Sequence, residues 1–122
     1  DMREILERAA QGDETAALAI QMFCYRLKKY MGAYHAVLHR LDAVVFTGGI
    51  GENASAIRQR ACEGLKHIGI GVDPAKNNAA KGSVSEIQRD DLPVKVLVVR
   101  TNEEREIALQ TIDAIERRKV RL

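Results

Sequence analysis

The sequence has few aromatic side chains: it contains no tryptophan, three tyrosines and two phenylalanines among 122 residues. Single-stranded nucleic acids are bound largely by base stacking on such rings, and duplexes by clustered positive charge. Here nineteen Lys and Arg residues nearly balance seventeen Asp and Glu residues, which gives a net charge of +2. The basic residues are scattered except at Arg117–Arg121, which we interpret as a solvated helix end. The composition therefore argues against nucleic acid as a partner.

Cysteine and long apolar runs are also scarce. The two cysteines, Cys24 and Cys62, form neither a paired metal-binding motif nor a disulfide framework, so we expect reduced thiols. No apolar run approaches the roughly 18 residues of a membrane span, and no segment resembles a signal peptide. These absences predict a cytoplasmic protein with no membrane contact. The length predicts one globular unit over residues 1–122.

The first part of the chain, residues 1–41, has a helical pattern. Asp1 and Glu4 have the spacing of a capping box, and Gly12 ends the short apolar stripe that follows. Asp13 can cap a second helix, from Glu14 to about His39, because apolar residues recur there at threes and fours. Gly32 inside this helix suggests a kink or close packing against another element.

The next stretch predicts a strand, a glycine turn and the start of a helix. Ala43–Phe46 is apolar at every position, which is typical of a strand covered on both faces. Asn53 or Ser55 is a plausible cap for the following helix. Glycine permits positive φ and close ligand approach, and a helix N-terminus favours anions, so the stretch suggests a phosphate loop. The glycines concerned are Gly48, Gly49 and Gly51.

Residues 56–99 continue the alternation of helix and strand. The apolar spacing from Ile57 to Ile68 predicts a third helix, and residues 73–82 are rich in turn-forming residues, which predicts a surface loop. A short edge strand is expected at Val84–Gln88, and a β-branched strand at Val94–Val99. We expect the two long strands to be parallel neighbours, joined through the intervening helix.

A final helix should begin near a capping box formed by Thr101 and Glu104. The turn at Arg100–Glu104 should then lie at the same sheet edge as the glycine loop, because parallel strands end together. Two or three strands leave sheet edges and faces uncovered, and the sequence begins at Asp1 without a methionine, so we expect further strands upstream. The inner face of the final helix should consist of Ile107, Ala108, Thr111, Ile112 and Ile115.

Three of these stretches resemble one known family. Asp42–Asn53, Gly69–Pro74 and Thr101–Glu104 are similar, in order and spacing, to segments of acetate kinase and its propionate and butyrate kinase relatives, members of the actin, Hsp70 and sugar kinase superfamily. Within the first stretch, Thr47–Asn53 resembles the signature loop of that family. The resemblance covers nearly the whole chain but only the last third or so of such an enzyme. It implies an α/β fold, the C-terminal part of an actin-like ATPase (ribonuclease H-like) domain, with an incomplete parallel sheet flanked by helices in which residues 42–122 follow the helical segment.

The resemblance also implies roles for individual residues. It implies ATP or ADP and Mg²⁺ as cofactors, a short-chain carboxylate as substrate, and a homodimer formed through this region. Glu103 would lie at the magnesium site, while Glu104 keeps a capping role, and Arg100 departs from the proline that is usual in the family. The family's catalytic arginines, histidine and aspartate have no counterparts in this chain. Residues implied to contact the nucleotide are Asp1, Met2, Arg3, Gly49, Ile50, Gly51, Glu52 and Asn53.

Two other interpretations remain open from the sequence. Gly49–Ala54 formally fits the G-x-G-x-x-A pattern of a dinucleotide-binding fold, with Asp73 as its ribose-binding acid, although Glu52 would place negative charge beside the pyrophosphate. A Walker P-loop is excluded because no Gly-Lys-Ser/Thr follows the turn. The chain could instead be a non-catalytic helical dimerisation module whose glycine loop is only structural.

Overall fold

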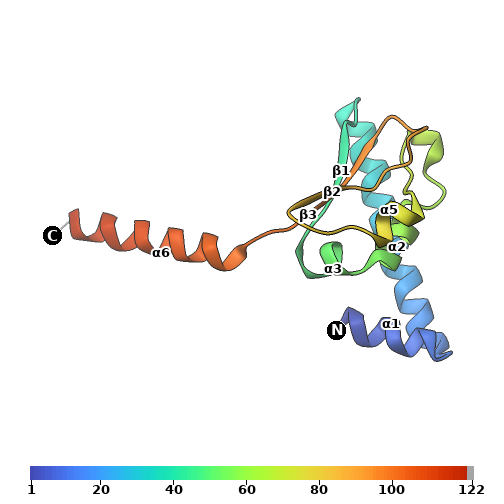
Figure 1. The fold of residues 1–122 in the computed structure, drawn as a ribbon, viewed down its shortest axis with the longest axis horizontal. Coiled ribbons are helices and arrows are strands. Elements are labelled where there is room, and N and C mark those ends of the chain that lie inside the picture. The colour runs from blue at the N-terminus through green and yellow to red at the C-terminus, as the bar shows by residue number, and fades with distance from the viewer. Residues whose placement is uncertain (121–122) are drawn as a thin grey trace.

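A computed structural model describes residues 1–120, with side chains through residue 118. The chain forms a small three-stranded sheet with most of its helices on one side, and one helix extends away from the rest (Figure 1). None of the described helices is long and apolar enough to cross a bilayer. The elements are α1 (Met2–Ala10), α2 (Glu14–Leu38), β1 (Ala43–Phe46), α3 (Gly48–Asn53), α4 (Ser55–Cys62), a 3₁₀ turn (Lys66–Ile68), α5 (Pro74–Asn78), β2 (Val84–Glu86), β3 (Lys95–Val99) and α6 (Glu103–Val120).

The sheet has the strand order β1-β3-β2. Strands β1 and β3 are parallel, with Val44 opposite Val96, which confirms that the two long strands are parallel neighbours. The expected edge strand β2 is present and runs antiparallel to β3, so the sheet is mixed. The prediction that β1 is covered on both faces is wrong for this chain, because Val45 is 52% exposed. In addition, β1 lies at the edge of the sheet. Local sequence shows that a strand is apolar but not which neighbour covers it.

Two apolar clusters make the core. The larger lies against the sheet and includes the fully buried Ile70, Ile87 and Val96. The smaller joins α1, α2 and α4 around Ile20 and Ile57. Both cysteines are buried and unpaired, as expected for reduced thiols, and burial raises the pKa of Cys62 to about 12.

The N-terminal helices begin where their caps predict. The Asp1 carboxylate accepts from the amide of Arg3, and that of Asp13 accepts from Ala16, at 2.9 and 3.0 Å. Asp1 thus caps α1, but the predicted Asp1–Glu4 capping box is wrong, because the carboxylate bonds the amide of Arg3 and not that of Glu4. Helix α2 is continuous through Gly32, and a Cβ built at this glycine would meet no heavy atom within 4 Å. Close packing is therefore not the reason for a glycine at this position.

The segment after the glycine loop differs from the prediction in two places. The third helix ends at Cys62, because Glu63 is extended and Gly64 adopts a φ of +78°, and only a 3₁₀ turn follows. The expected loop at residues 73–82 contains α5, whose start is fixed by the Asp73 carboxylate, which accepts from the amide of Lys76, and by Pro74 at the first helical position. Asp and Pro are also common in turns, so the local sequence does not distinguish a turn from this short helix.

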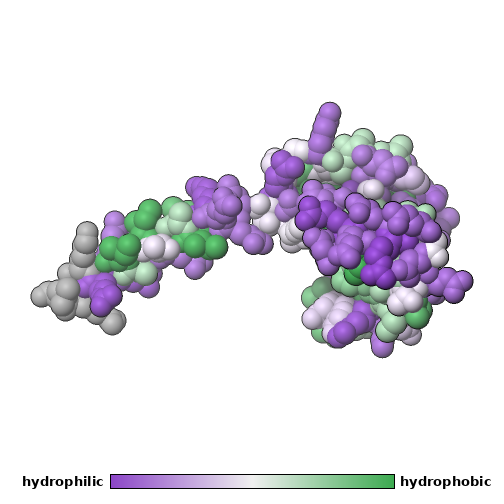
Figure 2. Space-filling view, turned by 90° about the horizontal axis from the view of Figure 1, so that it is seen from below, coloured by the Kyte–Doolittle hydropathy of each residue, from purple (hydrophilic) through white to green (hydrophobic). Residues whose placement is uncertain are grey.

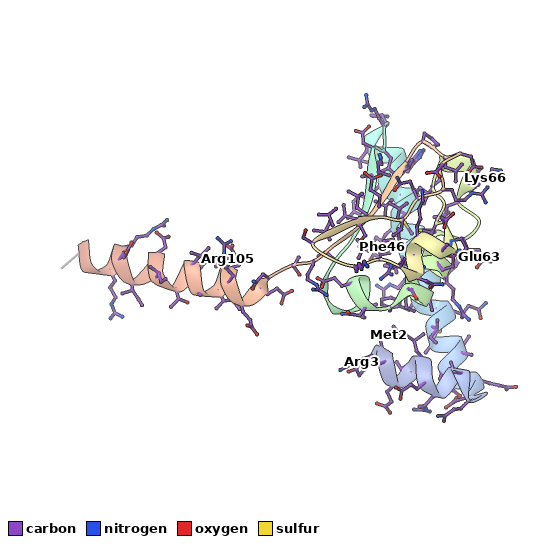
Figure 3. All side chains as sticks on the ribbon, in the orientation of Figure 1. Met2, Arg3, Phe46, Glu63, Lys66 and Arg105 are labelled. Carbon is purple, nitrogen blue, oxygen red and sulfur yellow. The ribbon has the colours of Figure 1, made fainter. Side chains whose placement is uncertain are left out.

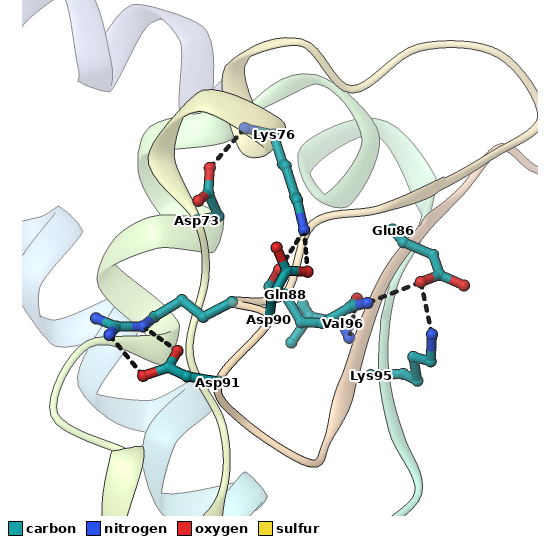
Figure 4. A network of polar contacts seen from close by, with 9 residues as sticks. Asp73, Lys76, Glu86, Gln88, Asp90, Asp91, Lys95 and Val96 are labelled. Carbon is teal, nitrogen blue, oxygen red and sulfur yellow. Dashed lines mark hydrogen bonds and ion pairs between the residues drawn. The ribbon is translucent and has the colours of Figure 1, made fainter.

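A polar network supports the β2–β3 hairpin (Figure 4). The buried Gln88 side chain accepts from the backbone amide of Val96 at 3.1 Å and donates to Glu86 at 2.7 Å. Glu86 also pairs with Lys95, and Lys76 reaches the Gln88 carbonyl and Asp90. The Gln88 side chain thus accepts from a β3 amide in place of a strand partner, so this buried amide is hydrogen-bonded although β2 is short.

Helix α6 has the predicted position but not the predicted packing. Its cap is Asn102, whose Oδ1 accepts from the amide of Arg105 at 3.0 Å, so the Thr101–Glu104 capping box is wrong. The helix extends away from the sheet, with apolar side chains along it (Figures 1 and 2). Residue 121, the end of the basic stretch, lies outside the described residues. Three residues of the expected inner face, Ile107, Ile112 and Ile115, are each at least half exposed, because periodicity defines an apolar side without supplying its partner.

Candidate functional site

The glycine loop forms a short helix rather than an open turn. Helix α3 begins directly after Thr47, and its first residue, Gly48, adopts a φ of +71° that favours glycine. Asn53 is the last residue of α3, and its Nδ2 donates to the Gly49 carbonyl at 2.9 Å. Neither Asn53 nor Ser55 caps the next helix, since Ala54 occupies that position. Because residues 48–53 are themselves helical, Asn53 lies inside α3 and does not precede α4 as a cap.

The three glycines serve different purposes. A Cβ at Gly51 would lie 3.0 Å from the backbone carbonyl carbon of Phe46, so α3 packs tightly on β1 at this point. A Cβ at Gly49 would meet nothing within 4 Å, and this residue has no positive φ. Positive φ explains Gly48 and close packing explains Gly51, while Gly49 leaves open space at the surface.

A cavity of about 560 Å³ lies between the start of α1 and helix α3. It brings together two segments that are far apart in sequence, Asp1–Arg3 and residues 49–54. Met2 and Arg3 lie at the start of α1, below α3 in the view of Figure 3. Of the eight residues implied to contact nucleotide, six line this cavity and two, Gly51 and Glu52, do not. The lining consists of Asp1, Met2, Arg3, Leu6, Gly49, Ile50, Asn53 and Ala54.

The charges at the cavity rim are exposed. Arg3 and Asp1 pair at 2.9 Å, with side chains that are 85% and 53% exposed. Exposed ion pairs of this kind stabilise a protein little, because water screens both groups. Arg3 is therefore accessible to a competing anion in the cavity without a large loss of folding free energy.

Glu52 faces inward and connects the glycine loop to the next strand-to-helix turn. Its Oε1 accepts from the Thr101 amide at 2.9 Å, the Thr101 hydroxyl at 3.1 Å and the Gly48 amide at 3.2 Å. These contacts confirm that the two turns lie at one sheet edge. The Arg100 guanidinium is 3.9 Å from the other carboxylate oxygen and 68% exposed, which makes it a weak partner.

The contacts of Glu52 predict a pH-dependent contribution to stability. The Thr101 amide, first among several donors, holds the pKa of Glu52 below its usual range. A lowered folded-state pKa stabilises the folded state above the ordinary glutamate pKa of about 4.3, and this contribution is lost as pH falls through the folded-state value. The melting temperature of the wild-type protein should therefore fall more steeply below about pH 4.3 than that of Glu52→Gln. Exposed Glu63→Gln is the control, and parallel melting curves for wild type and Glu52→Gln would contradict the role assigned to Glu52.

Glu103 is the first residue of α6, two positions after the Thr101 that Glu52 holds. Its side chain is exposed, and Glu104 and Glu106 share the first turn. Among the described residues, no three His, Cys, Asp or Glu side chains gather in a group that could hold a metal. A carboxylate oxygen suits Mg²⁺, which commonly takes only one or two protein carboxylates and completes its shell with water and phosphate. Glu103 fits such a role only as a single ligand or as a partner of metal-bound water.

Sequence reasoning missed the two buried polar residues nearest the loop, Arg58 and Asn77, each 2% exposed. A signal for Arg58 was present. In α4 it lies on the same face as Ile57, Ala61 and Cys62, all buried, so a charge occupies an apolar face of the helix. No comparable signal marked Asn77, because its segment was expected to be a loop.

Asp73 does not support a dinucleotide-binding fold. In such a fold the ribose-binding acid follows the strand beside the first one. Here the strand beside β1 is β3, and Asp73 precedes α5, where its carboxylate caps that helix. The carboxylate thus has a local structural role.

Comparison with known proteins matches this geometry to one family. The acetokinase family model matches residues 1–109. The acetate kinase of Syntrophobacter fumaroxidans is 55% identical over 117 residues, which cover 96% of this chain and 28% of that protein, and that of Lawsonia intracellularis is 48% identical over 94% of this chain and 28% of its own length.

Solved structures agree. Porphyromonas gingivalis acetate kinase has a TM-score of 0.81 at 40% identity, over 94% of this chain and 29% of that one. A propionate kinase from Francisella tularensis has a TM-score of 0.76 at 41% identity, over 85% of this chain and 26% of that one. The chain thus spans less than a third of the relatives it matches, and its α/β fold corresponds to part of theirs. By sequence and by structure, it belongs to the acetokinase family.

Proposed function

We propose that the full-length protein transfers a phosphoryl group between ATP and a short-chain carboxylate such as acetate, in the cytoplasm. The observation that carries this proposal is the cavity in which Asp1–Arg3 and the glycine loop meet. The relatives named acetate kinase and propionate kinase support the reaction class. Because this chain spans only part of their length, the activity belongs to the whole protein.

The cavity between α1 and α3 is the proposed nucleotide site. Gly49 leaves room for a ligand near the backbone, Ile50 offers an apolar contact, and the Asn53 amide already orders the loop through the Gly49 carbonyl. Arg3 supplies positive charge from the opposite wall. Phosphoryl transfer depends mainly on positioning and on neutralising charge, and these residues serve both needs.

Glu103 is the proposed magnesium contact of this chain. Mg²⁺ bound to nucleotide phosphates would neutralise charge at the transferring group. Glu103 would hold the ion or its water, and the Glu52–Thr101 hydrogen bonds would fix the start of α6 relative to the glycine loop.

The apolar surface that this chain leaves exposed suggests contacts with the rest of the full-length protein. A groove of about 390 Å³ between α2 and β1 is lined by Tyr30, Tyr34 and Val45, all more than half exposed. We propose that upstream residues of the same protein fill this groove and extend the free edge of β1. The apolar side of α6 would then contribute to a homodimer, which analytical ultracentrifugation of the full-length protein would test.

Activity assays test the proposed reaction. The full-length protein should release ADP in a coupled assay only when acetate, propionate or butyrate is present with ATP and Mg²⁺. The isolated 122-residue chain should show no turnover, because the family's phosphoryl-stabilising arginines, histidine and aspartate have no counterparts in it. Acetate-dependent turnover by the isolated chain would refute this division of roles. Calorimetry of the full-length protein with ATP·Mg and with NAD distinguishes a kinase from a dinucleotide-binding protein.

A further inference from the structure

Arg58 is a buried cation at the base of the glycine loop. It lies in α4, is 2% exposed, and donates four hydrogen bonds to uncharged oxygens. Its Nε and Nη2 donate to the side-chain and backbone oxygens of Asn77 at 2.7 and 2.9 Å. Its Nη1 donates to the carbonyls of Gly51 and Glu52, both at 2.9 Å. Burial lowers the pKa of Arg58, which is the cost of removing this charge from water.

The two loop carbonyls need this donor. The last four carbonyls of any helix lack partners within the helix. In the six-residue α3, the Ile50 carbonyl accepts from the Ala54 amide, whereas the next two accept from Arg58. The guanidinium therefore takes the place of the backbone amides that a continuing helix would have offered to these two carbonyls. A lysine could not do so, because its ammonium lacks the planar fork that reaches acceptors on two sides.

Asn77 connects this arrangement to a second element. Its Nδ2 donates to the Ser55 carbonyl at 2.8 Å, while its own oxygens accept from Arg58. The end of α3, the start of α4 and the end of α5 are thus held at one point. Arg58 holds the backbone carbonyls of residues 51 and 52, while the Thr101 amide holds the side-chain carboxylate of Glu52.

We propose that Arg58 is a positioning residue for the nucleotide cavity. It donates to the Gly51 and Glu52 carbonyls of α3 while it is itself anchored by the oxygens of Asn77, and so it fixes the helix on which Gly49, Ile50 and Asn53 line that cavity. Arg58 itself does not line it. This inference rests on the proposed function only in naming the ligand as a nucleotide. The geometric part, that Arg58 sets the loop, stands without it.

The test uses Arg58→Lys and Asn77→Ala in the full-length protein, with Arg60→Lys as control, since Arg60 is exposed on the same helix. Without nucleotide, amide hydrogen exchange of residues 48–54 should speed up in both variants while residues 95–99 of β3 stay protected. The dissociation constant for ATP·Mg, measured by calorimetry, should rise about tenfold, the size expected for losing hydrogen bonds to a charged donor. The KM for the carboxylate should change little, and Arg60→Lys should match wild type throughout.

Three results would overturn the inference: unchanged exchange in the loop, equal acceleration of exchange in the loop and in β3, or equal weakening of nucleotide and carboxylate binding. The second and third would make Arg58 a general stability residue. If the wild-type protein fails to bind ATP·Mg, the proposed function fails, whereas the exchange measurement still decides whether Arg58 positions the loop.

Discussion

Replacing Gly49 with valine in the full-length protein should weaken ATP·Mg binding about ten- to a hundredfold while leaving the fold intact. Gly49 lines the cavity between α1 and α3, and a Cβ there meets no protein atom. The backbone at Gly49 is not in the left-handed region either, so valine faces no φ penalty. The added side chain would occupy cavity space that the proposed ligand needs. Calorimetry with ATP·Mg measures the effect, and the KM for the carboxylate should remain near the wild-type value.

Gly51→Val is the matched variant, and it should mainly lower the stability of the fold. Its Cβ would lie 3.0 Å from the Phe46 carbonyl carbon, a backbone atom that cannot move aside like a flexible side chain. Overpacking of this type costs about 1–3 kcal/mol of folding free energy, so the melting temperature should fall by several degrees. The two glycines thus have different surroundings, open space at Gly49 and a backbone contact at Gly51, so their valine variants should differ. Unchanged ATP affinity in a folded Gly49→Val variant would show that the loop is only a turn.

Glu103→Gln should raise the magnesium concentration needed for half-maximal rate by about tenfold, while Glu104→Gln should leave it nearly unchanged. Both acids lie in the exposed first turn of α6 and complement its dipole equally, so a purely structural role predicts the same small stability loss, about 0.3–1 kcal/mol each. Only a contact with the metal or its water distinguishes them. Magnesium titrations of the rate, run beside thermal melts, measure both quantities.

The asymmetry between the two variants decides this prediction. Superimposable magnesium curves would mean that Glu103 serves only the helix dipole. Glu106→Gln, in the same turn, is a further control and should behave like Glu104→Gln. The magnesium dependence is the informative readout. The maximal rate is less informative, because a substitution at the start of α6 could also disturb the nearby Glu52–Thr101 hydrogen bond.

The starts of α1 and α2 and the two long strands follow from the sequence because their signals are local. Asp1 and Asp13 cap the helices that they precede, since a short carboxylate reaches amides only two or three residues away. Strands β1 and β3 are recognisable from apolar, β-branched runs, and their parallel pairing follows from the helical connection between them. The glycine loop and the residues beside it likewise identify the family. All these features depend on neighbours along the chain.

Tertiary structure alone decided which side chains meet. The pairing of Glu52 with Thr101 and of Arg58 with Asn77 joins residues 49 and 19 positions apart, and nothing local specifies such partners. The cavity exists because α1, which packs on α2, lies across from α3, and no local motif encodes that placement. The separate reasons for Gly48, Gly49 and Gly51 depend on one φ angle and one distance to Phe46. Sequence thus determined the two long strands, the starts of α1 and α2 and the family. The fold determined the contacts of the site, because hydrogen bonding and packing act through space rather than along the chain.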